Sequence, residues 1–318
     1  MMQRSFAAFT ALAVAGVALT AAMAAAQRGP LRPRITCLAH VALYVHDIDA
    51  SRTYYRDVLG YEELLALKNA DGALALTFFK INERQYVELF PEREAGSDRF
   101  AHYALEVDDV EAMRVYLKSR GVTVPDKVNV GRVGNTNFNV KDPDGHTVEF
   151  LKYGADGLMG KAEGTSMPAG RISTTMRHAG ILVGSLSASM TFYREILGFR
   201  ETWRGSRDGK TLDWVNLQLP DGDDYIEFML YADLPEPGKR GSQHHICLIV
   251  PDIEAAVATV RARAAQAGYT RAIEPRTGIN RKRQLNLFDP DGTRSELMEP
   301  GTVDGKPVPS SEAPPPRR

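Results

Sequence analysis

This chain has few cysteines and almost no net charge. Cys37 and Cys247 are the two cysteines among 318 residues, and this excludes a small fold held together by several disulfides. Because both lie in strand-like segments of different parts of the chain, we expect two buried free thiols rather than one bridge. The net charge of −1 indicates neither a nucleic-acid partner nor an anionic membrane surface, so we expect neither.

The first 26 residues differ in composition from the rest of the chain. Arg4 is followed by an alanine-rich apolar run, and the sequence AAA directly precedes Gln27. A charged start, an apolar run and an A-x-A ending are typical of a secretory signal peptide. We therefore predict that residues 1–26 are a signal peptide and that the mature chain is exported, periplasmic or secreted, with no membrane attachment after cleavage. The alternative is an uncleaved anchor, because the run approaches membrane-spanning length.

The rest of the chain repeats itself. YYRDVLGY at 54–61 matches FYREILGF at 192–199, and the turn DPDG occurs at 142–145 and again at 289–292. A repeat of this length indicates a duplicated structural unit.

The repeat divides the chain into two similar halves, residues 35–153 and residues 177–300. Residues 154–176 between them are rich in Gly, Ser and Thr and are interpreted as a linker. The Pro-rich residues 301–318 are predicted to be a disordered tail.

Each half contains the same order of elements twice. The segment ITCLAHVALYV (35–45) alternates like a strand, and the next segment begins with Asp47 and ends with Gly60, which are start and stop signals of a helix. Further strands follow, and the pattern restarts at RFAHYALEV (99–107). The chain therefore contains four copies of a strand–helix–strands unit, which indicates an α+β fold.

Four of the seven histidines occupy the same position of this unit, and four glutamates occupy another. The pairs are His40 and Glu88, His102 and Glu149, His178 and Glu227, and His245 and Glu296. Strand alternation places these glutamates on half-apolar faces, where an unpaired carboxylate is costly. Two neutral imidazoles and two carboxylates suit a divalent Zn, Fe, Ni, Mn or Co ion. For any single pair, the alternative is a core histidine and a solvent-facing glutamate.

Other histidines and the two tryptophans give weaker signals. His146 follows the first DPDG turn and is expected at the surface. His244 adjoins His245 but points to the opposite strand face. Trp203 and Trp214 could line a substrate cup, although core packing is the expectation.

Several segments resemble the vicinal oxygen chelate superfamily, which includes type I glyoxalases, extradiol dioxygenases, methylmalonyl-CoA epimerases and bleomycin and fosfomycin resistance proteins. The matching segments are AHVALYV, YYRDVLGY, YVELF, AHYALEV and DPDGHTVEF in the first half, and HAGILV, FYREILGF, YIEFML, HICLIV and DPDGTRSEL in the second. The resemblance implies four βαβββ modules that pair into two cupped, eight-stranded, barrel-like domains. It leaves open whether modules pair within a half or across the halves.

The glyoxalase pattern implies one His and one Glu ligand from each module. It gives His40, Glu88, His102 and Glu149 in the first half, and His178, Glu227, His245 and Glu296 in the second. Such a metal chelates two adjacent substrate oxygens and acts as a Lewis acid. In glyoxalase-like members the last carboxylate can also act as a base, and the candidates here are Glu149 and Glu296.

The expected function is therefore that of an exported, metal-dependent lyase or isomerase of the glyoxalase type, acting on a small molecule. Glutathione is a cytosolic thiol, so the prediction covers the chemistry and not the glutathione substrate. One alternative is an extradiol-type Fe(II) dioxygenase that uses His178, His245 and Glu296. Another is a non-enzymatic small-molecule binding or resistance protein. The chain is expected to be a monomer or a homodimer.

Overall fold

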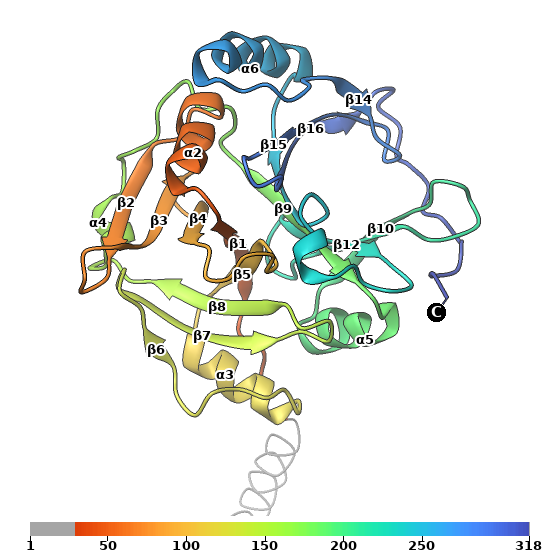
Figure 1. Ribbon diagram of the computed structural model, residues 1–318. Coiled ribbons are helices and arrows are strands. Elements are labelled where there is room, and N and C mark those ends of the chain that lie inside the picture. Colours follow the sequence, from red (N-terminus) through yellow and green to blue (C-terminus); the bar gives the residue numbers. More distant parts are fainter. Residues whose placement is uncertain (1–28, 318) are drawn as a thin grey trace, which may run out of the picture.

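The computed structural model describes residues 29–317, and the predicted signal peptide lies outside them. It contains two curled sheets side by side, with helices on their outer faces (Figure 1). Each sheet has eight strands, in the order β2-β3-β4-β1-β5-β8-β7-β6 and β10-β11-β12-β9-β13-β16-β15-β14. The predicted α+β fold with two cupped eight-stranded domains is confirmed, and modules pair within each half rather than across the halves.

The first sheet takes its strands from the first half of the chain. They are β1 (Ile35–Val45), β2 (Glu63–Lys68), β3 (Leu74–Lys80), β4 (Tyr86–Pro91), β5 (Phe100–Val107), β6 (Asn129–Val130), β7 (Asn135–Lys141) and β8 (Thr147–Tyr153). Its helical segments are α2 (Ile48–Thr53), the π-helix η1 (Tyr54–Val58) and α3 (Val110–Ser119), and α4 (Leu158–Lys161) follows in the connection to the second half.

The second sheet repeats this order. Its strands are β9 (Met176–Val183), β10 (Arg200–Gly205), β11 (Trp214–Gln218), β12 (Tyr225–Leu230), β13 (His245–Ile249), β14 (Pro275–Thr277), β15 (Lys282–Phe288) and β16 (Arg294–Thr302). Its helical segments are α5 (Leu186–Met190), the π-helix η2 (Thr191–Ile196), the 3-10 turn η3 (Pro237–Lys239) and α6 (Ile253–Ala267).

Helix boundaries follow the signals in the sequence. The carboxylate of Asp47 accepts hydrogen bonds from two backbone N–H groups in the first turn of α2, and Asp252 does the same for α6. Such caps satisfy N–H groups that have no partner within the helix. Gly268 ends α6 in a left-handed conformation with φ of 66°, which costs glycine little. No helix among residues 29–317 combines the length and apolarity that crossing a membrane requires.

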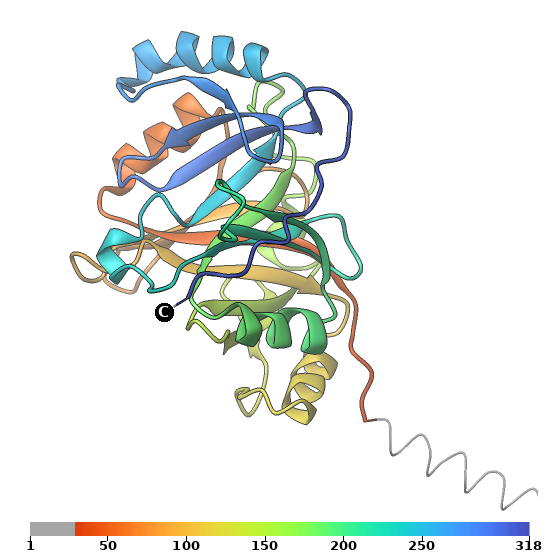
Figure 2. The same ribbon diagram turned by 90° about the vertical axis from the view of Figure 1, so that its right-hand side faces the viewer.

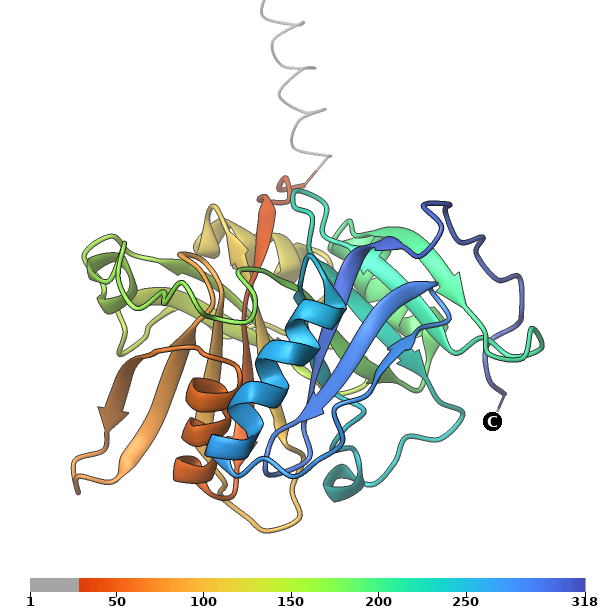
Figure 3. The same cartoon turned by 90° about the horizontal axis from the view of Figure 1, so that it is seen from above.

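One apolar core joins the two halves, and it contains buried side chains from both sheets. Helices of each half pack on the opposite half. Figure 3 shows α6 beside α2, and Arg263 of α6 donates a hydrogen bond to the carbonyl of Val58 at the end of η1. In the reciprocal contact, Tyr116 of α3 donates a 2.6 Å hydrogen bond to the carbonyl of Ile196 in η2. Cys37 and Cys247 are buried free thiols, as predicted.

Each DPDG turn also contacts the other half. In the first turn, the carboxylate of Asp144 accepts hydrogen bonds from the N–H of Gly184 and the hydroxyl of Ser189, both at 3.0 Å. In the second turn, the carboxylate of Asp291 accepts a 2.9 Å hydrogen bond from the N–H of His46. The repeated turn therefore both reverses the chain before the last strand of each half and docks that half on its neighbour.

His146 does not lie at the surface, and the expectation of an exposed side chain is wrong. Its side chain is 4% exposed, and its Nδ1 hydrogen-bonds the carboxylate of Asp142 at 2.8 Å. The ring packs edge-on against His244 of the second half, with centroids 5.3 Å apart. Contact between the halves buries this histidine, and the pattern of its own strand contains no sign of that contact.

The C-terminal segment also differs from the expectation of disorder. It runs back along the second half (Figure 2), where the N–H of Ser311 donates to the carbonyl of Arg204 and the N–H of Leu212 donates to the carbonyl of Pro314. Ala313 is buried. The strand β10 lies at the edge of its sheet, so its outer backbone groups lack a neighbouring strand. The tail satisfies part of this edge despite its proline content.

Two equivalent aspartates of the DPDG turns differ in their partners. Asp142 hydrogen-bonds His146 and Tyr193; burial alone would raise the pKa of Asp142, but these partners lower it. At the position of His146 the second turn has Thr293. Burial accordingly raises the pKa of Asp289 to about 7, with a further contribution from the nearby Asp291.

The Asp289→Asn variant should make stability less dependent on pH. A carboxyl with a raised folded-state pKa stabilises the fold below its ordinary pKa of 3.8 and loses that contribution as the pH rises through about 7. Between pH 5 and pH 8, urea unfolding should therefore show the variant gaining stability relative to the parent, by about 2.5 kcal/mol.

The matched Asp142→Asn variant should lose stability relative to the parent at pH 7, because it removes the ionised partner of His146. If the stability difference between Asp289→Asn and the parent is the same at pH 5 and at pH 8, the raised pKa assigned to Asp289 is contradicted.

Candidate metal centres

The eight candidate ligands lie on the four central strands of each sheet. In the first sheet the adjacent strands β4, β1, β5 and β8 carry Glu88, His40, His102 and Glu149. In the second, β12, β9, β13 and β16 carry Glu227, His178, His245 and Glu296. The four side chains of each set converge on one side of their sheet, and each module supplies one His and one Glu to the cup of its own half.

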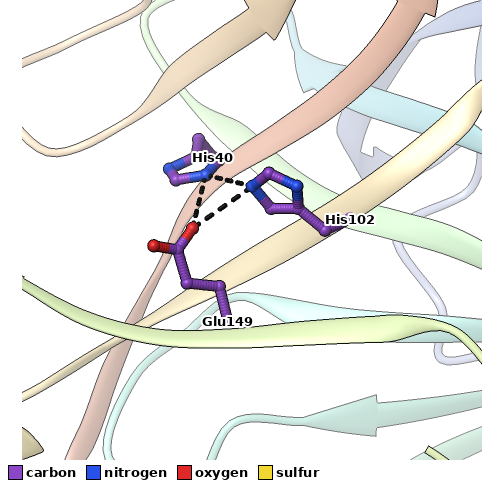
Figure 4. A group of neighbouring side chains, drawn as sticks. All are labelled: His40, His102 and Glu149. Carbon is purple, nitrogen blue, oxygen red and sulfur yellow. Dashed lines mark hydrogen bonds and ion pairs between the residues drawn. The ribbon is translucent and has the colours of Figure 1, made fainter. Parts of the chain in front are cut away.

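In the first cup the four side chains converge on one point. The Nε2 atoms of His40 and His102 are 2.9 Å apart, and each lies 3.1–3.2 Å from Glu149 Oε2. Figure 4 shows these three side chains facing one another from three strands. Glu88 Oε2 completes the group at 3.4 Å from His40 Nε2 and 3.3 Å from His102 Nε2.

The second cup repeats this arrangement with slightly wider spacing. His178 Nε2 and His245 Nε2 are 3.0 Å apart. Both carboxylates, those of Glu227 and Glu296, lie 3.4 Å from His245 Nε2. They lie 3.9 Å and 3.8 Å from His178 Nε2. The two glutamates are therefore equivalent in their distances to the histidines.

The spacing of these donor atoms fits a single divalent cation. Ligand atoms that bind one ion at about 2.1 Å lie about 3.0 Å apart at right angles and about 3.4 Å apart in a tetrahedron. All four donors of the first cup fall within 2.9–3.4 Å of the histidine nitrogens. Imidazole nitrogen and carboxylate oxygen are ligands of Zn, Fe, Mn, Ni and Co. The residues present in both cups thus fit a divalent metal.

Burial and mutual charge control the ionisation of the ligands. Burial disfavours the charged imidazole of His102, but Glu149 and Glu88 outweigh this effect and raise its pKa to about 10. Burial likewise opposes ionisation of Glu149, yet its histidine partners lower the pKa to about 2. In the second cup burial dominates at His178 and lowers its pKa to about 4. A metal binds the neutral imidazole, so His178 binds it without first losing a proton at neutral pH.

Small residues between the ligands make room for the imidazoles. Ala42 lies directly opposite both Glu88 and His102 on the neighbouring strands. Gly180 holds the equivalent place opposite Glu227 and His245. A Cβ atom at Gly180 would lie 1.9–2.7 Å from atoms of the His245 ring. With the His245 ring in this position, there is no room for a side chain at position 180.

Comparison with known proteins identifies the family of this chain. A family model for the Glyoxalase/Bleomycin resistance protein/Dioxygenase superfamily matches residues 38–150 and again residues 175–297. The chain belongs to this superfamily.

The chain is similar along most of its length to Glyoxalase I of Saccharomyces cerevisiae. The two are 22% identical over 280 residues, which cover 81% of this chain and 78% of the relative. A probable lactoylglutathione lyase of Vibrio parahaemolyticus is 30% identical over 134 residues, 39% of this chain and 96% of the relative. These relatives are enzymes by name, as expected for this chain.

Solved structures of the superfamily share the fold. The Mn(II)-bound glyoxalase of Novosphingobium aromaticivorans matches with a TM-score of 0.63 and 19% identity, with 89% of each chain covered. A homoprotocatechuate 2,3-dioxygenase of Brevibacterium fuscum also matches with a TM-score of 0.63, at 18% identity, with 89% of this chain and 76% of the dioxygenase covered. A divalent metal is thus in keeping with both the ligands and the family.

The two cups of this superfamily member have different walls. One side of the first cup is filled by a cluster of apolar side chains that includes Phe78, which packs edge-on against His40. Met159 of α4, in the segment interpreted as a linker, is buried in the same cluster. The other members of this cluster are Leu64, Leu65, Leu67, Leu76, Tyr86, Val133 and Tyr153. The connection between the halves therefore covers part of the first cup.

The second cup has other residues at the same places. Cross-strand pairing makes Trp203, Gly205, Trp214 and Asn216 the counterparts of Leu65, Leu67, Leu76 and Phe78. Two of these residues, Trp203 and Trp214, line a cavity of about 370 Å³ that reaches the candidate ligands Glu227 and Glu296. The expectation that both tryptophans pack in the core is wrong, because both line this cavity.

The partners of the outer imidazole nitrogens also differ between the cups. His40 Nδ1 hydrogen-bonds the hydroxyl of Tyr153 at 2.9 Å. His245 Nδ1 lies 3.0 Å from the carbonyl of Gln243 and 2.6 Å from the guanidinium of Arg294. Donation from Nδ1 to the carbonyl leaves Nε2 free to bind a metal, as is usual for metal-bound histidines. The contact of Arg294 with Nδ1 competes with this hydrogen bond to the Gln243 carbonyl. The sequence analysis did not identify Arg294 as a candidate site residue.

The Gly180→Ala variant should lose the second metal site and keep the first. The added methyl group would occupy the volume of the His245 imidazole, so the ring must leave its position among the ligands. Elemental analysis should show about one metal fewer per chain than in the parent.

The matched control is Ala42→Gly in the first cup, which should keep both metals because it only adds space. Retention of the full metal content by Gly180→Ala would contradict the role given to this glycine, and the metal of the first cup reports that the variant is folded.

Proposed function

We propose that the chain is a metal-dependent lyase or isomerase of the glyoxalase type whose reaction takes place in the second cup. The observation that carries this proposal is the complete set of two histidines and two glutamates. In each cup, the two glutamate oxygens lie at nearly the same distance from a given histidine Nε2, with a difference of at most 0.3 Å.

The choice of the second cup depends on access. Its cavity of about 370 Å³ reaches Glu227 and Glu296, and this volume lies at the lower end of the range for small-molecule sites. The first cup has the same ligands, but apolar side chains and α4 occupy one of its sides. We therefore assign the first metal a structural role, and the second a role in the reaction.

Residues of the second cup have distinct tasks in this proposal. His178, His245, Glu227 and Glu296 would hold the ion, which when bound supplies Lewis acidity to two adjacent substrate oxygens. Glu296 lines the cavity and is ionised at neutral pH, because burial is outweighed by His245 and Arg294 and its pKa is about 2. Its carboxylate is the candidate to accept a proton from a substrate carbon and return it to a neighbouring atom.

A ring-cleaving dioxygenase is the second candidate. His178, His245 and Glu296 form a compact group of three possible ligands, and two His with one carboxylate are typical of non-haem Fe(II) oxygenases. Glu227 argues against it, since this carboxylate lies as close to His245 as Glu296 does. A fourth protein ligand would occupy one of the positions that such enzymes keep open for O₂ and substrate.

Paired ligand variants should assign the two metals. We expect about two divalent ions per chain in the parent and about one each in His40→Ala/Glu149→Ala and His178→Ala/Glu296→Ala. Metal content is measured by elemental analysis, and each variant is then assayed with the substrate class that the metal indicates. Zinc, nickel or manganese directs the assay to isomerase and lyase substrates, and iron directs it to catechols with O₂.

Turnover should be lost in the His178→Ala/Glu296→Ala variant and kept in the His40→Ala/Glu149→Ala variant. The reverse result would place the reaction in the first cup. A parent that binds no metal even after reconstitution would leave the small-molecule binding protein as the better description.

Export of the chain is part of the same proposal and is tested separately. The charged start, the apolar run and the AAA sequence before Gln27 support it. Expression in a bacterium followed by fractionation should give mature protein that begins at Gln27, outside the cytoplasm. A full-length chain that stays in the cytoplasmic fraction would contradict the assignment, and one in the membrane fraction would favour the uncleaved anchor.

A further inference from the structure

The cavity of the second cup has a charge distribution that the metal ligands do not explain. Besides Glu227 and Glu296, three arginines line it: Arg207, Arg276 and Arg294. A divalent ion held by the two glutamates would balance their charge, so the arginines would remain as net positive charge around the cavity.

Arg294 is half-buried and lacks an acidic partner. Among residues 29–317, no carboxylate lies within 4.0 Å of its guanidinium, which contacts His245 Nδ1 at 2.6 Å and Met229 Sδ at 3.6 Å. Its Nε is buried with no hydrogen-bond partner. A buried N–H group without a hydrogen-bond partner is costly. Thr147 holds the equivalent place in the first cup, two residues before Glu149, so this charge is specific to the second cup.

Arg276 lies exposed on β14 at the rim of the cavity, and no side chain among the described residues pairs with it. Arg207 differs, because it lies near Asp213 at 3.5 Å and over the ring of Trp214 at 4.8 Å. Within the described part of the chain, Arg276 and Arg294 therefore have no carboxylate partner within 4.0 Å and are the two candidates to bind an anion. Guanidinium groups bind carboxylates through two parallel hydrogen bonds.

Trp203 and Trp214 form the apolar part of the same wall. Gly205 leaves the space that the indole of Trp203 occupies, because a Cβ there would lie 2.2 Å from the ring. Indole rings offer a large, flat apolar surface. The cavity thus combines a flat apolar wall, two unpaired guanidinium groups and the metal ligands.

We propose that the second cup binds a small carboxylate with a flat apolar body, whose carboxylate is held by Arg276 and Arg294 and whose body lies against Trp203 and Trp214. This inference rests on the proposed function, since it names the substrate class of that site. When the carboxylate binds, Arg294 turns from His245 toward it and leaves His245 Nδ1 to the Gln243 carbonyl.

The tryptophans provide a direct test, because Trp203 and Trp214 are the only two in the 318-residue chain. Intrinsic tryptophan fluorescence therefore reports on this cavity alone. The mature chain with its metals is titrated with phenylacetate and with phenylacetamide, a neutral compound of the same shape. We expect a saturable change with phenylacetate and at least about tenfold weaker binding of the amide, which corresponds to about 1.4 kcal/mol.

Arginine variants test which groups bind the anion. Arg276→Met and Arg294→Met should each weaken phenylacetate binding about tenfold and leave binding of the amide unchanged. The matched control is Arg283→Met, because Arg283 lies on β15 but pairs with Glu254 on α6. This variant should bind phenylacetate like the parent. Elemental analysis of Arg294→Met should show full metal content, since the substitution removes a positive charge beside the ligands.

Three results would overturn the inference. The first is equal binding of phenylacetate and phenylacetamide, and the second is no saturable response to the acid. The third is unchanged phenylacetate binding in both arginine variants together with its loss in Glu296→Ala, which would mean that the carboxylate binds the metal instead. Failure of the proposed function is distinguishable: a chain without metal that still binds phenylacetate through Arg276 and Arg294 would keep the anion site and lose the metal-dependent reaction.

Discussion

Each half of the molecule depends on two imidazoles and two carboxylates at the centre of its sheet. Four adjacent strands contribute one of these side chains each, and all are buried or nearly so. Taking a carboxylate out of water costs several kcal/mol unless an opposite charge or a hydrogen bond compensates it. In the first cup the imidazole of His102, with its raised pKa, compensates Glu88 and Glu149; a divalent ion would do so in both cups. The four groups can therefore be buried together only where their charges balance one another.

This constraint extends to the residues between the ligands. The side chain directly opposite two ligands must be small, and the first cup has Ala42 and Ala104 at these places, where the second has Gly180 and Cys247. A larger residue at any of them would displace an imidazole or a carboxylate. The walls of the cup carry no such constraint. They differ between the halves, from leucines and phenylalanine in the first to tryptophans, arginines and asparagine in the second.

The sequence was sufficient to predict features that have a regular period. Alternation along strands gave the faces of the sheets, and the repeat gave the module order and the convergence of four His-Glu pairs. It was insufficient where a side chain is buried by a distant segment. His146 is buried by His244 of the other half, and the tail is held by the edge strand β10, so neither is indicated by local pattern. Trp203 and Trp214 were misplaced for a related reason: alternation gives the face of a strand but cannot distinguish a filled cup from an open one.

The filled first cup and the open second cup follow from a small number of substitutions at equivalent positions. Where the first cup has Leu65 and Leu76 in an apolar cluster, the second has Trp203 and Trp214 in the wall of a cavity, and both cups keep two His and two Glu. The connection between the halves contributes as well, because Met159 of α4 is buried in the cluster of the first cup. Docking of each DPDG turn on the opposite half then ties the two cups into one body. In this body the second cup has open space beside its candidate ligands at positions where the first cup has apolar packing.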